Sequence, residues 1–219
     1  MNISGFIGTT LIDYPGVLSS IVFTQGCNFD CWYCHNHQLK EVCSGEFNTS
    51  AVVEKLVSRK SVIDGVVITG GEPTLQEGLI DFIRLLKGIG FKVKLDTNGS
   101  NPDVLEKAIY YIDYIAMDIK STFSKYHNIA KGVDLTNILK SIEIIDSSTI
   151  ESEFRTTTWR DHLLVKDFEE ILTYFNKDNY YIHNYNNINN NYDVLPELKS
   201  NIQPLLDKYS FIKLRGDWL

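Results

Sequence analysis

Short apolar runs alternate with amphipathic segments along most of this 219-residue chain, and no other feature constrains its fold as strongly. The runs with the composition of buried strands are Ser19–Phe23, Gly65–Thr69, Lys92–Asp96, Tyr114–Lys120, Ser152–Thr158 and Tyr180–Tyr185. Segments with apolar residues at helical spacing lie between them, at Thr49–Lys60, Gln76–Lys87, Asp103–Tyr110, Leu135–Ile145 and Lys166–Tyr174. This alternation predicts parallel strands joined by right-handed crossovers, either in an open doubly wound sheet or in a barrel of about six βα units. We expect one domain that spans residues 1–219.

Composition and charge narrow the classes of function. The net charge is −7 with 28 acidic against 21 basic residues, so a general nucleic-acid binder is not expected. No apolar run approaches the ~20 residues that span a bilayer, and the N-terminus lacks the features of a signal peptide. We therefore expect a cytoplasmic protein without a membrane partner. In that compartment thiols stay reduced, so the four cysteines favour metal binding over disulfides.

Three of the cysteines, Cys27, Cys31 and Cys34, follow the first strand with C-x3-C-x2-C spacing. Three thiolates could hold a four-iron, four-sulfur cluster and leave its fourth iron open. A structural zinc site would need a fourth ligand, and His35 is too close in sequence to supply it comfortably. Cys31–His35 also matches the c-type haem attachment motif, but that interpretation leaves Cys27 unexplained. Cys43 lies outside the spacing, and we expect a free, buried cysteine there.

Polar residues follow the other strands at their carboxyl ends, where parallel α/β folds bind ligands. They are Gly70, Gly71 and Glu72 after the second strand, Asp96 and Asn98 at the third, Asp118 and Lys120 at the fourth, Arg155 on the fifth and His183 on the sixth. Because side chains alternate along a strand, Asp96 and Asn98 should face the same way, as should Asp118 and Lys120. We expect these groups to converge on one rim.

Five motifs in order give the chain a family resemblance over roughly residues 5 to 158. They are TLIDYPG at 10–16, GCNFDCWYCHN at 26–36, GVVITGGEPT at 65–74, KLDTNG at 94–99 and MDIK at 117–120. The chain resembles radical S-adenosylmethionine enzymes, and among them the proteins that activate glycyl-radical enzymes. The TLIDYPG subgroup, which activates anaerobic ribonucleoside-triphosphate reductase, is the most similar. This resemblance implies a partial (β/α)6 TIM-like barrel with parallel strands.

The resemblance also implies site residues. Cys27, Cys31 and Cys34 would bind one 4Fe-4S cluster, and Tyr33 would pack against the adenine of S-adenosylmethionine, unless it only packs the loop. Gly70, Gly71 and Glu72 would bind the methionine end, with a simple turn as the alternative. Asp96 and Asn98 would meet ribose hydroxyls or the carboxylate. Asp118 and Lys120 would either lie near the cofactor, where some relatives have a monovalent cation, or form a buried ion pair. Arg155 would contact either the carboxylate of the cofactor or a neighbouring acidic residue.

The implied activity is reductive cleavage of S-adenosylmethionine at the cluster, followed by removal of a hydrogen atom from a glycine of anaerobic ribonucleotide reductase. No catalytic residue beyond the cluster ligands is expected, and a flavodoxin- or ferredoxin-type protein would supply the electron. Alternatives are an activase of another glycyl-radical enzyme such as pyruvate formate-lyase, and a small-molecule enzyme similar to 7-carboxy-7-deazaguanine synthase. A zinc-stabilised binding protein is the non-enzymatic alternative.

The last third of the chain departs from this family. Trp159-Arg-Asp161 stands where Val-Val-Pro is usual, and the region from Tyr180 lacks the expected glutamine and proline. These differences leave the roles of His183 and Tyr185 open. The Asn-rich segment 183–193 has the composition of a surface loop, and Phe211–Asp217 is a candidate for a short closing strand.

Overall fold

A computed structural model describes residues 1–130, 132–159, 162–176, 179–185 and 196–216. Its strands are β1 (Ile3–Thr10), β2 (Ser19–Thr24), β3 (Gly65–Gly70), β4 (Lys92–Thr97), β5 (Tyr114–Asp118), β6 (Glu151–Thr158), β7 (Tyr180–Asn184) and β8 (Ile212–Arg215). All six strands predicted from the apolar runs are present, and the candidate closing strand is β8. The sequence pattern missed β1, whose residues ISGFIGTT include two glycines, which are depleted in strands.

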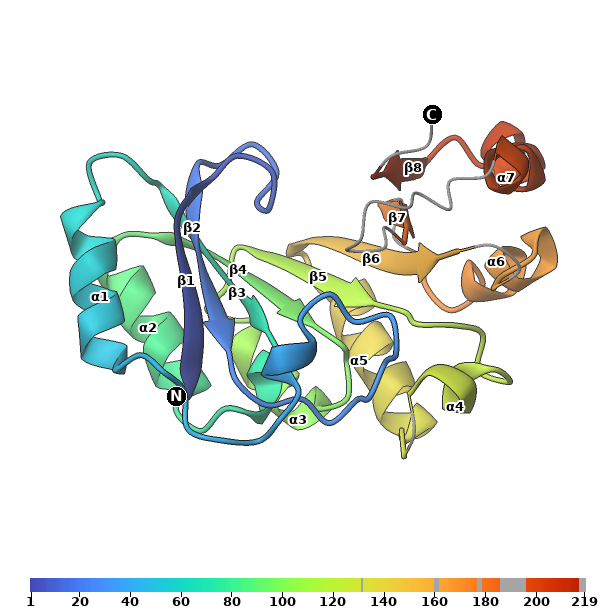
Figure 1. Ribbon diagram of the computed structural model, residues 1–219. Helices are drawn as coiled ribbons and strands as arrows, with labels where there is room; N and C mark the ends of the chain where they lie inside the picture. Colours follow the sequence, from blue (N-terminus) through green and yellow to red (C-terminus); the bar gives the residue numbers. More distant parts are fainter. Residues whose placement is uncertain (131, 160–161, 177–178, 186–195, 217–219) are drawn as a thin grey trace.

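The strands form one sheet in the order β1 to β8, and every neighbouring pair is parallel except β1 with β2. A doubly wound sheet would reverse its strand order at a switch point, whereas this order runs in one direction, as in a barrel. Among the described residues, β1 and β8 are edge strands that do not pair with each other. The α/β fold with a partial parallel barrel is thus confirmed (Figure 1).

Helices follow most strands, as the alternation predicts. They are α1 (Thr49–Ser58), α2 (Leu79–Ile89), α3 (Pro102–Ala108), α4 (Tyr126–Ile129), α5 (Leu135–Ser147), α6 (Val165–Ile171) and α7 (Pro196–Lys208). Local chemistry fixes their ends: the side chain of Asn48 caps α1 by accepting the Ser50 amide, and Gly90 ends α2 in the left-handed conformation. The short α4 and the C-terminal α7 were not predicted. No helix in the described parts is both long and apolar enough to cross a membrane.

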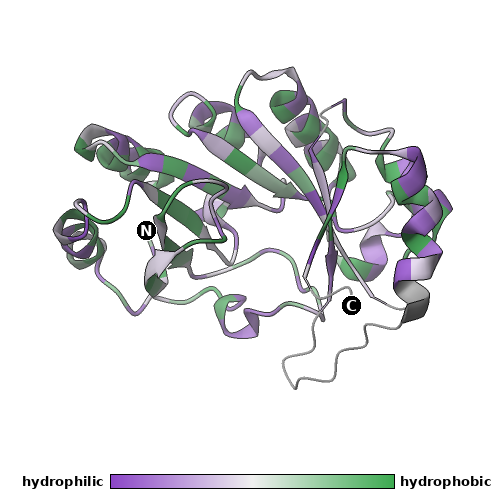
Figure 2. Ribbon diagram, turned by 90° about the horizontal axis from the view of Figure 1, so that it is seen from above, coloured by the Kyte–Doolittle hydropathy of each residue, from purple (hydrophilic) through white to green (hydrophobic). Residues whose placement is uncertain are grey.

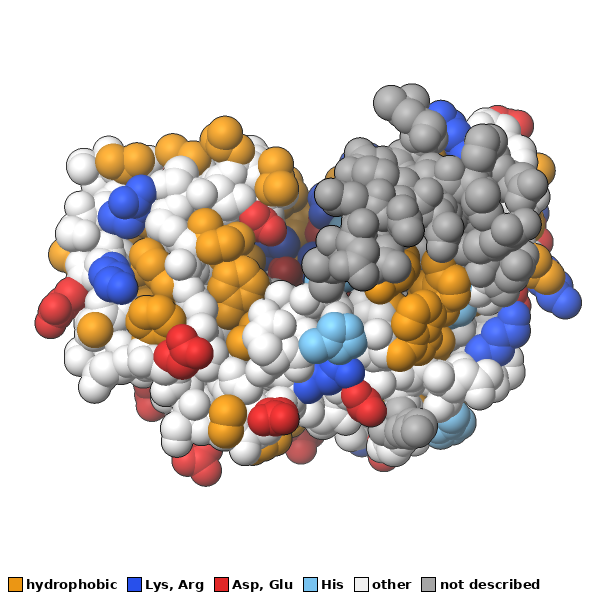
Figure 3. Space-filling model, viewed as in Figure 1, with side chains coloured by type: hydrophobic (Ala, Val, Ile, Leu, Met, Phe, Trp, Pro, Cys, Tyr) orange, Lys and Arg blue, Asp and Glu red, His pale blue; other side chains and the backbone are white. Residues whose placement is uncertain are grey.

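The two faces of the curved sheet have different chemistry. Residues such as Val93 and Leu95 pack against the helices in the main core, which lies outside the arc of strands. Figure 2 shows this arc from above, with hydrophobic and hydrophilic residues alternating along the strands. On the inner face Lys94 and Asp96 alternate with them, and Figure 3 shows basic and acidic side chains inside a hollow of the molecule. The polar inner face therefore surrounds the space at the carboxyl ends of the strands.

Candidate functional site

A cavity of about 200 Å³ lies at the carboxyl ends of β2 to β6. Every residue that the motifs singled out for cluster or cofactor binding lines it: Cys27, Cys31, Tyr33, Cys34, Gly70, Gly71, Glu72, Asp96, Asn98, Asp118, Lys120 and Arg155. The predicted convergence on one rim is thus present in the fold. The individual roles of these residues remain predictions.

The three motif cysteines lie on the loop that leaves β2. Cys31 is buried, Cys27 and Cys34 are partly buried, and the backbone amide of Phe29 lies 3.4 Å from the sulfur of Cys27. Burial raises the pKa of the Cys27 thiol to about 11 and also raises that of Cys31. Among the described residues, no three His, Cys, Asp or Glu side chains are placed to hold one metal ion. Thiolates that bind three different irons of a cube need not converge on one point, so this arrangement fits a cluster.

Two glycines at the end of β3 allow the cluster loop to lie against the sheet. Gly70 has φ +118°, and a Cβ atom there would lie 2.3 Å from the backbone nitrogen of Thr24. A Cβ atom on Gly71 would lie 2.2 Å from the carbonyl oxygen of Gly26, the residue before Cys27. Glycine is therefore required at both positions, because the backbone of the chain itself, at Thr24 and Gly26, approaches too closely for a side chain.

The carboxylate of Glu72 joins the glycine turn to the end of β4. It is buried and accepts hydrogen bonds from the amide and hydroxyl of Thr74, the hydroxyl of Thr97 and the amide of Asn98, at 2.6–3.0 Å. Burial raises the pKa of Glu72, while these hydrogen bonds lower it. A simple turn in which Glu72 is exposed, the alternative interpretation of this segment, is therefore wrong. Glu72 positions the walls of the cavity, and its contact with a ligand ammonium group remains a prediction.

Asn98 connects β4 to the cluster loop. Its side-chain amide donates to the side-chain oxygen of Asn28 at 3.0 Å and lies 3.9 Å from the sulfur of Cys27. Its side-chain oxygen accepts the amide of Ser100 at 2.9 Å, so the turn signal in Asn98-Gly99 is also present. Hydrogen bonds to ligand sulfurs are one means by which a protein tunes a cluster.

A buried ionic cluster, which we define as Lys94, Asp96, Asp118, Lys120 and Arg155, lies at the floor of the cavity, and all of its members except Lys94 line the cavity. Arg155 donates through Nε to Asp118 at 2.7 Å and through Nη1 to Asp96 at 3.3 Å. Lys120 pairs with Asp118 at 2.9 Å, and Lys94 pairs with Asp96 at 2.7 Å. Burial raises the pKa of both carboxyl groups, but the adjacent cations outweigh it and hold both below their ordinary value. The ion-pair alternatives considered for Lys120 and Arg155 are thus realised.

Aromatic rings surround Tyr33 on the other side of the cavity. Its ring is buried and lies 4.9 Å from the ring of Trp159 and 6.2 Å from that of Tyr185. Trp32 packs edge-on against Trp159 at 4.8 Å, and half of its side chain is exposed. The substitution at Trp159 therefore contacts the cluster loop directly. Loop packing by Tyr33 is present, and stacking on adenine remains a prediction.

His183 and Cys43 were uncertain from the sequence. His183 lies on the inner face of β7 in register with Thr157 and Arg215, and burial, with Arg155 nearby, lowers its pKa to about 4. The expectation that Cys43 is buried is wrong, because the loop before α1 leaves its thiol exposed. Arg160, Asp161 and residues 186–193 of the Asn-rich segment lie outside the described residues.

Sequence reasoning missed several residues of the inner face. Lys94 and Glu153 are fully or almost fully buried there, and Arg215 reaches Glu153 from β8 with two hydrogen bonds of 2.8 and 2.7 Å. The rule that paired Asp96 with Asn98 would have found Lys94, since charged residues at i and i+2 in an apolar strand share a face.

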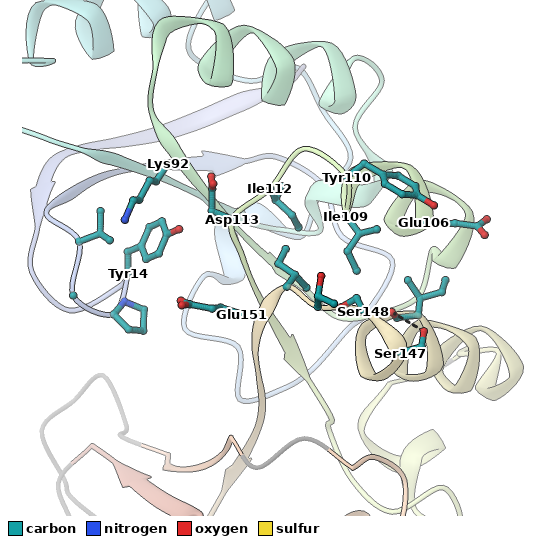
Figure 4. A pocket seen from close by; sticks show the side chains of 16 residues that line it. Tyr14, Lys92, Glu106, Ile109, Tyr110, Ile112, Asp113, Ser147, Ser148 and Glu151 are labelled. Carbon is teal, nitrogen blue, oxygen red and sulfur yellow. Dashed lines mark hydrogen bonds between the residues drawn. The ribbon is translucent and has the colours of Figure 1, made fainter.

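A larger cavity, about 930 Å³, lies at the opposite end of the strands. Tyr14, Lys92, Asp113 and Glu151 line it, at the amino ends of β4, β5 and β6 (Figure 4). It contains none of the cysteines. Because ligands of parallel sheets bind at the carboxyl ends, the smaller cavity is the candidate active site.

Comparison with known proteins agrees with this chemistry. The family model described as "Radical SAM superfamily" matches residues 21–175, which include the cluster loop, most of β2 and the strands from β3 to β6. The chain belongs to the radical SAM superfamily. An inferred glycyl-radical enzyme activating enzyme of Methanocaldococcus jannaschii is 38% identical over 179 residues, covering 77% of this chain and 73% of that protein. The chain is thus also a member of the glycyl-radical enzyme activating enzymes.

Other relatives match a smaller part. The pyruvate formate-lyase-activating enzyme of Clostridium pasteurianum is 36% identical over 116 residues, which are 50% of this chain and 48% of that enzyme. Among solved structures, QueE from Escherichia coli has a TM-score of 0.63 at 16% identity and covers 98% of this chain and 93% of its own. This likeness shows the fold alone.

The residues in the cavity fit a cluster and S-adenosylmethionine. Three thiols, with amide groups near the sulfur of Cys27, suit three irons, and the buried cations suit an anionic group of the cofactor.

Proposed function

We propose that this protein activates an anaerobic ribonucleoside-triphosphate reductase by generating a glycyl radical on it. The observation that carries the proposal is the gathering of all the predicted cluster and cofactor residues in one cavity of a radical SAM fold. The TLIDYPG motif at 10–16 and the Cys34-His-Asn36 sequence favour this target. A cluster held by Cys27, Cys31 and Cys34 would supply the electron for reductive cleavage of S-adenosylmethionine.

The chain's own residues would bind and orient the cofactor. Tyr33 would support the adenine from the aromatic side of the cavity, and the buried ionic cluster would face the carboxylate and ribose from the other side. Glu72, Gly70 and Gly71 would fix the wall against which the methionine end lies. No residue is assigned as a general base, because hydrogen-atom transfer moves the proton and electron together.

Pyruvate formate-lyase is the second candidate target, because several similar proteins carry the name of its activating enzyme. The chain spans about half to two thirds of the length of those relatives. A flavodoxin- or ferredoxin-type protein would be the electron donor for either target, in the cytoplasm.

The test is an anaerobic assay with the reconstituted protein, S-adenosylmethionine and reductant. Addition of an anaerobic ribonucleotide reductase should give the doublet of a glycyl radical in the electron paramagnetic resonance spectrum, and Cys31→Ala should abolish it. A signal with pyruvate formate-lyase alone would replace the first target by the second. Protein that binds zinc, contains no sulfide and never forms 5′-deoxyadenosine would contradict both.

A further inference from the structure

The buried ionic cluster already satisfies the carboxylates that a free cation would use. The two oxygens of Asp96 accept from Lys94 and Arg155, and the two oxygens of Asp118 accept from Arg155 and Lys120. Each of the four oxygens thus has a tethered cationic partner within 2.7–3.3 Å. A hard monovalent cation binds through such oxygens, so these residues do not fit one.

Charge balance leads to the same result. Within the cluster three cationic side chains face two carboxylates. Arg155 also lies 3.8 Å from the buried carboxylate of Glu153, which pairs with Arg215, so the count with both included is four cationic groups against three carboxylates and again leaves one excess positive charge. Such an excess suits an anionic group of a bound cofactor, and a further free cation would raise it at a site largely shielded from water.

Lys94 is the member that makes this arrangement possible. Its side chain is 2% exposed and extends along the inner face from one layer below Asp96, with its ammonium group 5.8 Å from the centre of the Tyr114 ring. Val67 and Tyr114 flank it on the neighbouring strands. Among the described residues, this buried lysine forms one ion pair, with the carboxylate of Asp96.

We propose that the ammonium group of Lys94 is a built-in substitute for a monovalent cation, so that this enzyme binds S-adenosylmethionine without Na⁺ or K⁺. Lys94 is a positioning residue: it holds Asp96, and through it Arg155, in the geometry that meets the cofactor. The inference rests on the proposed placement of Asp96 and Asp118 beside the cofactor.

The test compares binding of S-adenosylmethionine to the reconstituted protein in KCl and in choline chloride of equal ionic strength. Wild-type protein should bind equally well in both. Lys94→Met should bind about tenfold to a hundredfold more weakly in choline chloride, as expected for a lost charge-assisted hydrogen bond, and KCl should restore most of the loss. Lys92→Met, at the exposed start of the same strand, is the matched control and should behave as wild type.

A structural measurement accompanies the binding assay. Anomalous diffraction from rubidium-soaked crystals should show no ion at Asp96 in the wild type and an ion there in Lys94→Met. If that variant does not fold, Lys94→Gln, which is one atom shorter but keeps a hydrogen-bond donor and removes the charge, takes its place.

Several outcomes would overturn the proposal: rubidium bound to Asp96 in the wild type, wild-type binding at least fivefold tighter in KCl, a Lys94 variant that binds as wild type in choline chloride, or a loss that KCl does not restore. None of these measurements uses a partner protein. A wrong choice of target enzyme would therefore show only in the radical assay.

Discussion

At the residue scale, the thiols of Cys27 and Cys31 lie in surroundings that raise their pKa and so disfavour their charged form. Burial is the largest influence on the pKa of Cys27, and the negative charge of Glu72 adds to it, while the amide of Phe29 acts in the opposite direction. A thiol must lose its proton to bind iron. Without the cluster these two thiols therefore stay neutral, and cluster binding has to provide the energy that ionises them.

This burial gives the stability of the cluster-free protein a pH dependence. The unfolded chain ionises Cys27 near its ordinary value of 9.0, whereas the folded protein keeps the proton until about pH 11. The unfolded state thus binds fewer protons in this range, and the free energy of unfolding should fall by about 1 kcal/mol per pH unit for this thiol. Urea unfolding from pH 8 to 11 measures it. Cys27→Ala should show a shallower slope than wild type, whereas the exposed Cys43→Ala should not; equal slopes for both would contradict the assignment.

Glu72 provides a second test at this scale. In Glu72→Gln the amide nitrogen would meet the backbone N–H of Asn98 or the hydroxyl donors of Thr74 and Thr97, so at least one buried donor would lose its acceptor. We expect a loss of about 1–3 kcal/mol in the free energy of unfolding. Glu77→Gln, an exposed residue five positions later, is the control and should change stability by less than about 0.5 kcal/mol. If Glu72→Gln were as stable as Glu77→Gln, the conclusion that the Glu72 carboxylate joins the glycine turn to the end of β4 would be wrong.

At the scale of elements, the turn after β3 decides where the cluster loop lies. The backbone amide of Glu72 donates to the carbonyl of Gly26 at 2.8 Å, and the amide of Gly71 donates to that of Thr24 at 2.9 Å. These contacts leave no room for a side chain on Gly71. The turn therefore sets the height of the cysteine loop above the sheet.

Gly71→Ala should displace that loop and reduce cluster assembly. Its Cβ would lie 2.2 Å from a backbone oxygen that cannot rotate away, so iron and sulfide content after reconstitution should fall to less than about half of the wild-type value. Gly88→Ala is the matched control, because a Cβ there meets nothing within 4 Å inside α2. The control should keep full iron content and gain about 0.5–1 kcal/mol of stability. Full iron content in Gly71→Ala would show that the loop tolerates the shift.

The elements also show what the sequence can and cannot predict. Apolar runs identified six of the seven parallel strands, because strands buried on both faces leave a dense signal, and the seventh, β8, was only a candidate. β1 was not predicted, because an edge strand that contains Gly5 and Gly8 has only a weak hydrophobic signal in the sequence. The motifs identified the cavity residues by type and order, but their ion pairs depend on neighbouring strands and could not be predicted. The prediction for Cys43 was wrong because it used only the general tendency of free cysteines to be buried, which does not show whether a particular loop lies at the surface.

At the scale of the whole molecule, ion pairs hold the C-terminal strands to the rest of the sheet. Arg215 on β8 lies 3.6 Å from the Tyr181 ring of β7 and reaches Glu153 on β6. Glu153 is fully buried and also accepts the hydroxyl of Tyr114 on β5 at 2.9 Å. The carboxylate of Glu153 thus links β5, β6 and β8, and Arg215 adds β7 through its contact with Tyr181.

Removal of the arginine should leave that buried carboxylate without its two closest charged hydrogen bonds, while Arg155, 3.8 Å away, still compensates part of its charge. Arg215→Met is expected to lower the free energy of unfolding by about 1–3 kcal/mol. The double variant Arg215→Met, Glu153→Gln should recover at least half of this loss, because it removes the buried charge as well. Equilibrium urea unfolding of the two variants and of Glu153→Gln alone gives the coupling energy. If the double variant were no more stable than Arg215→Met, the lost free energy of unfolding would not come from the unpaired charge of Glu153.

The aromatic contact between Trp32 and Trp159 has an optical consequence. Two of the three tryptophans in the chain lie within or against the loop that would hold an iron–sulfur chromophore. Their ultraviolet emission should dim as the chromophore forms and brighten as oxygen destroys it. Tryptophan fluorescence should therefore report how much of the protein contains a cluster, without an added label and under anaerobic conditions.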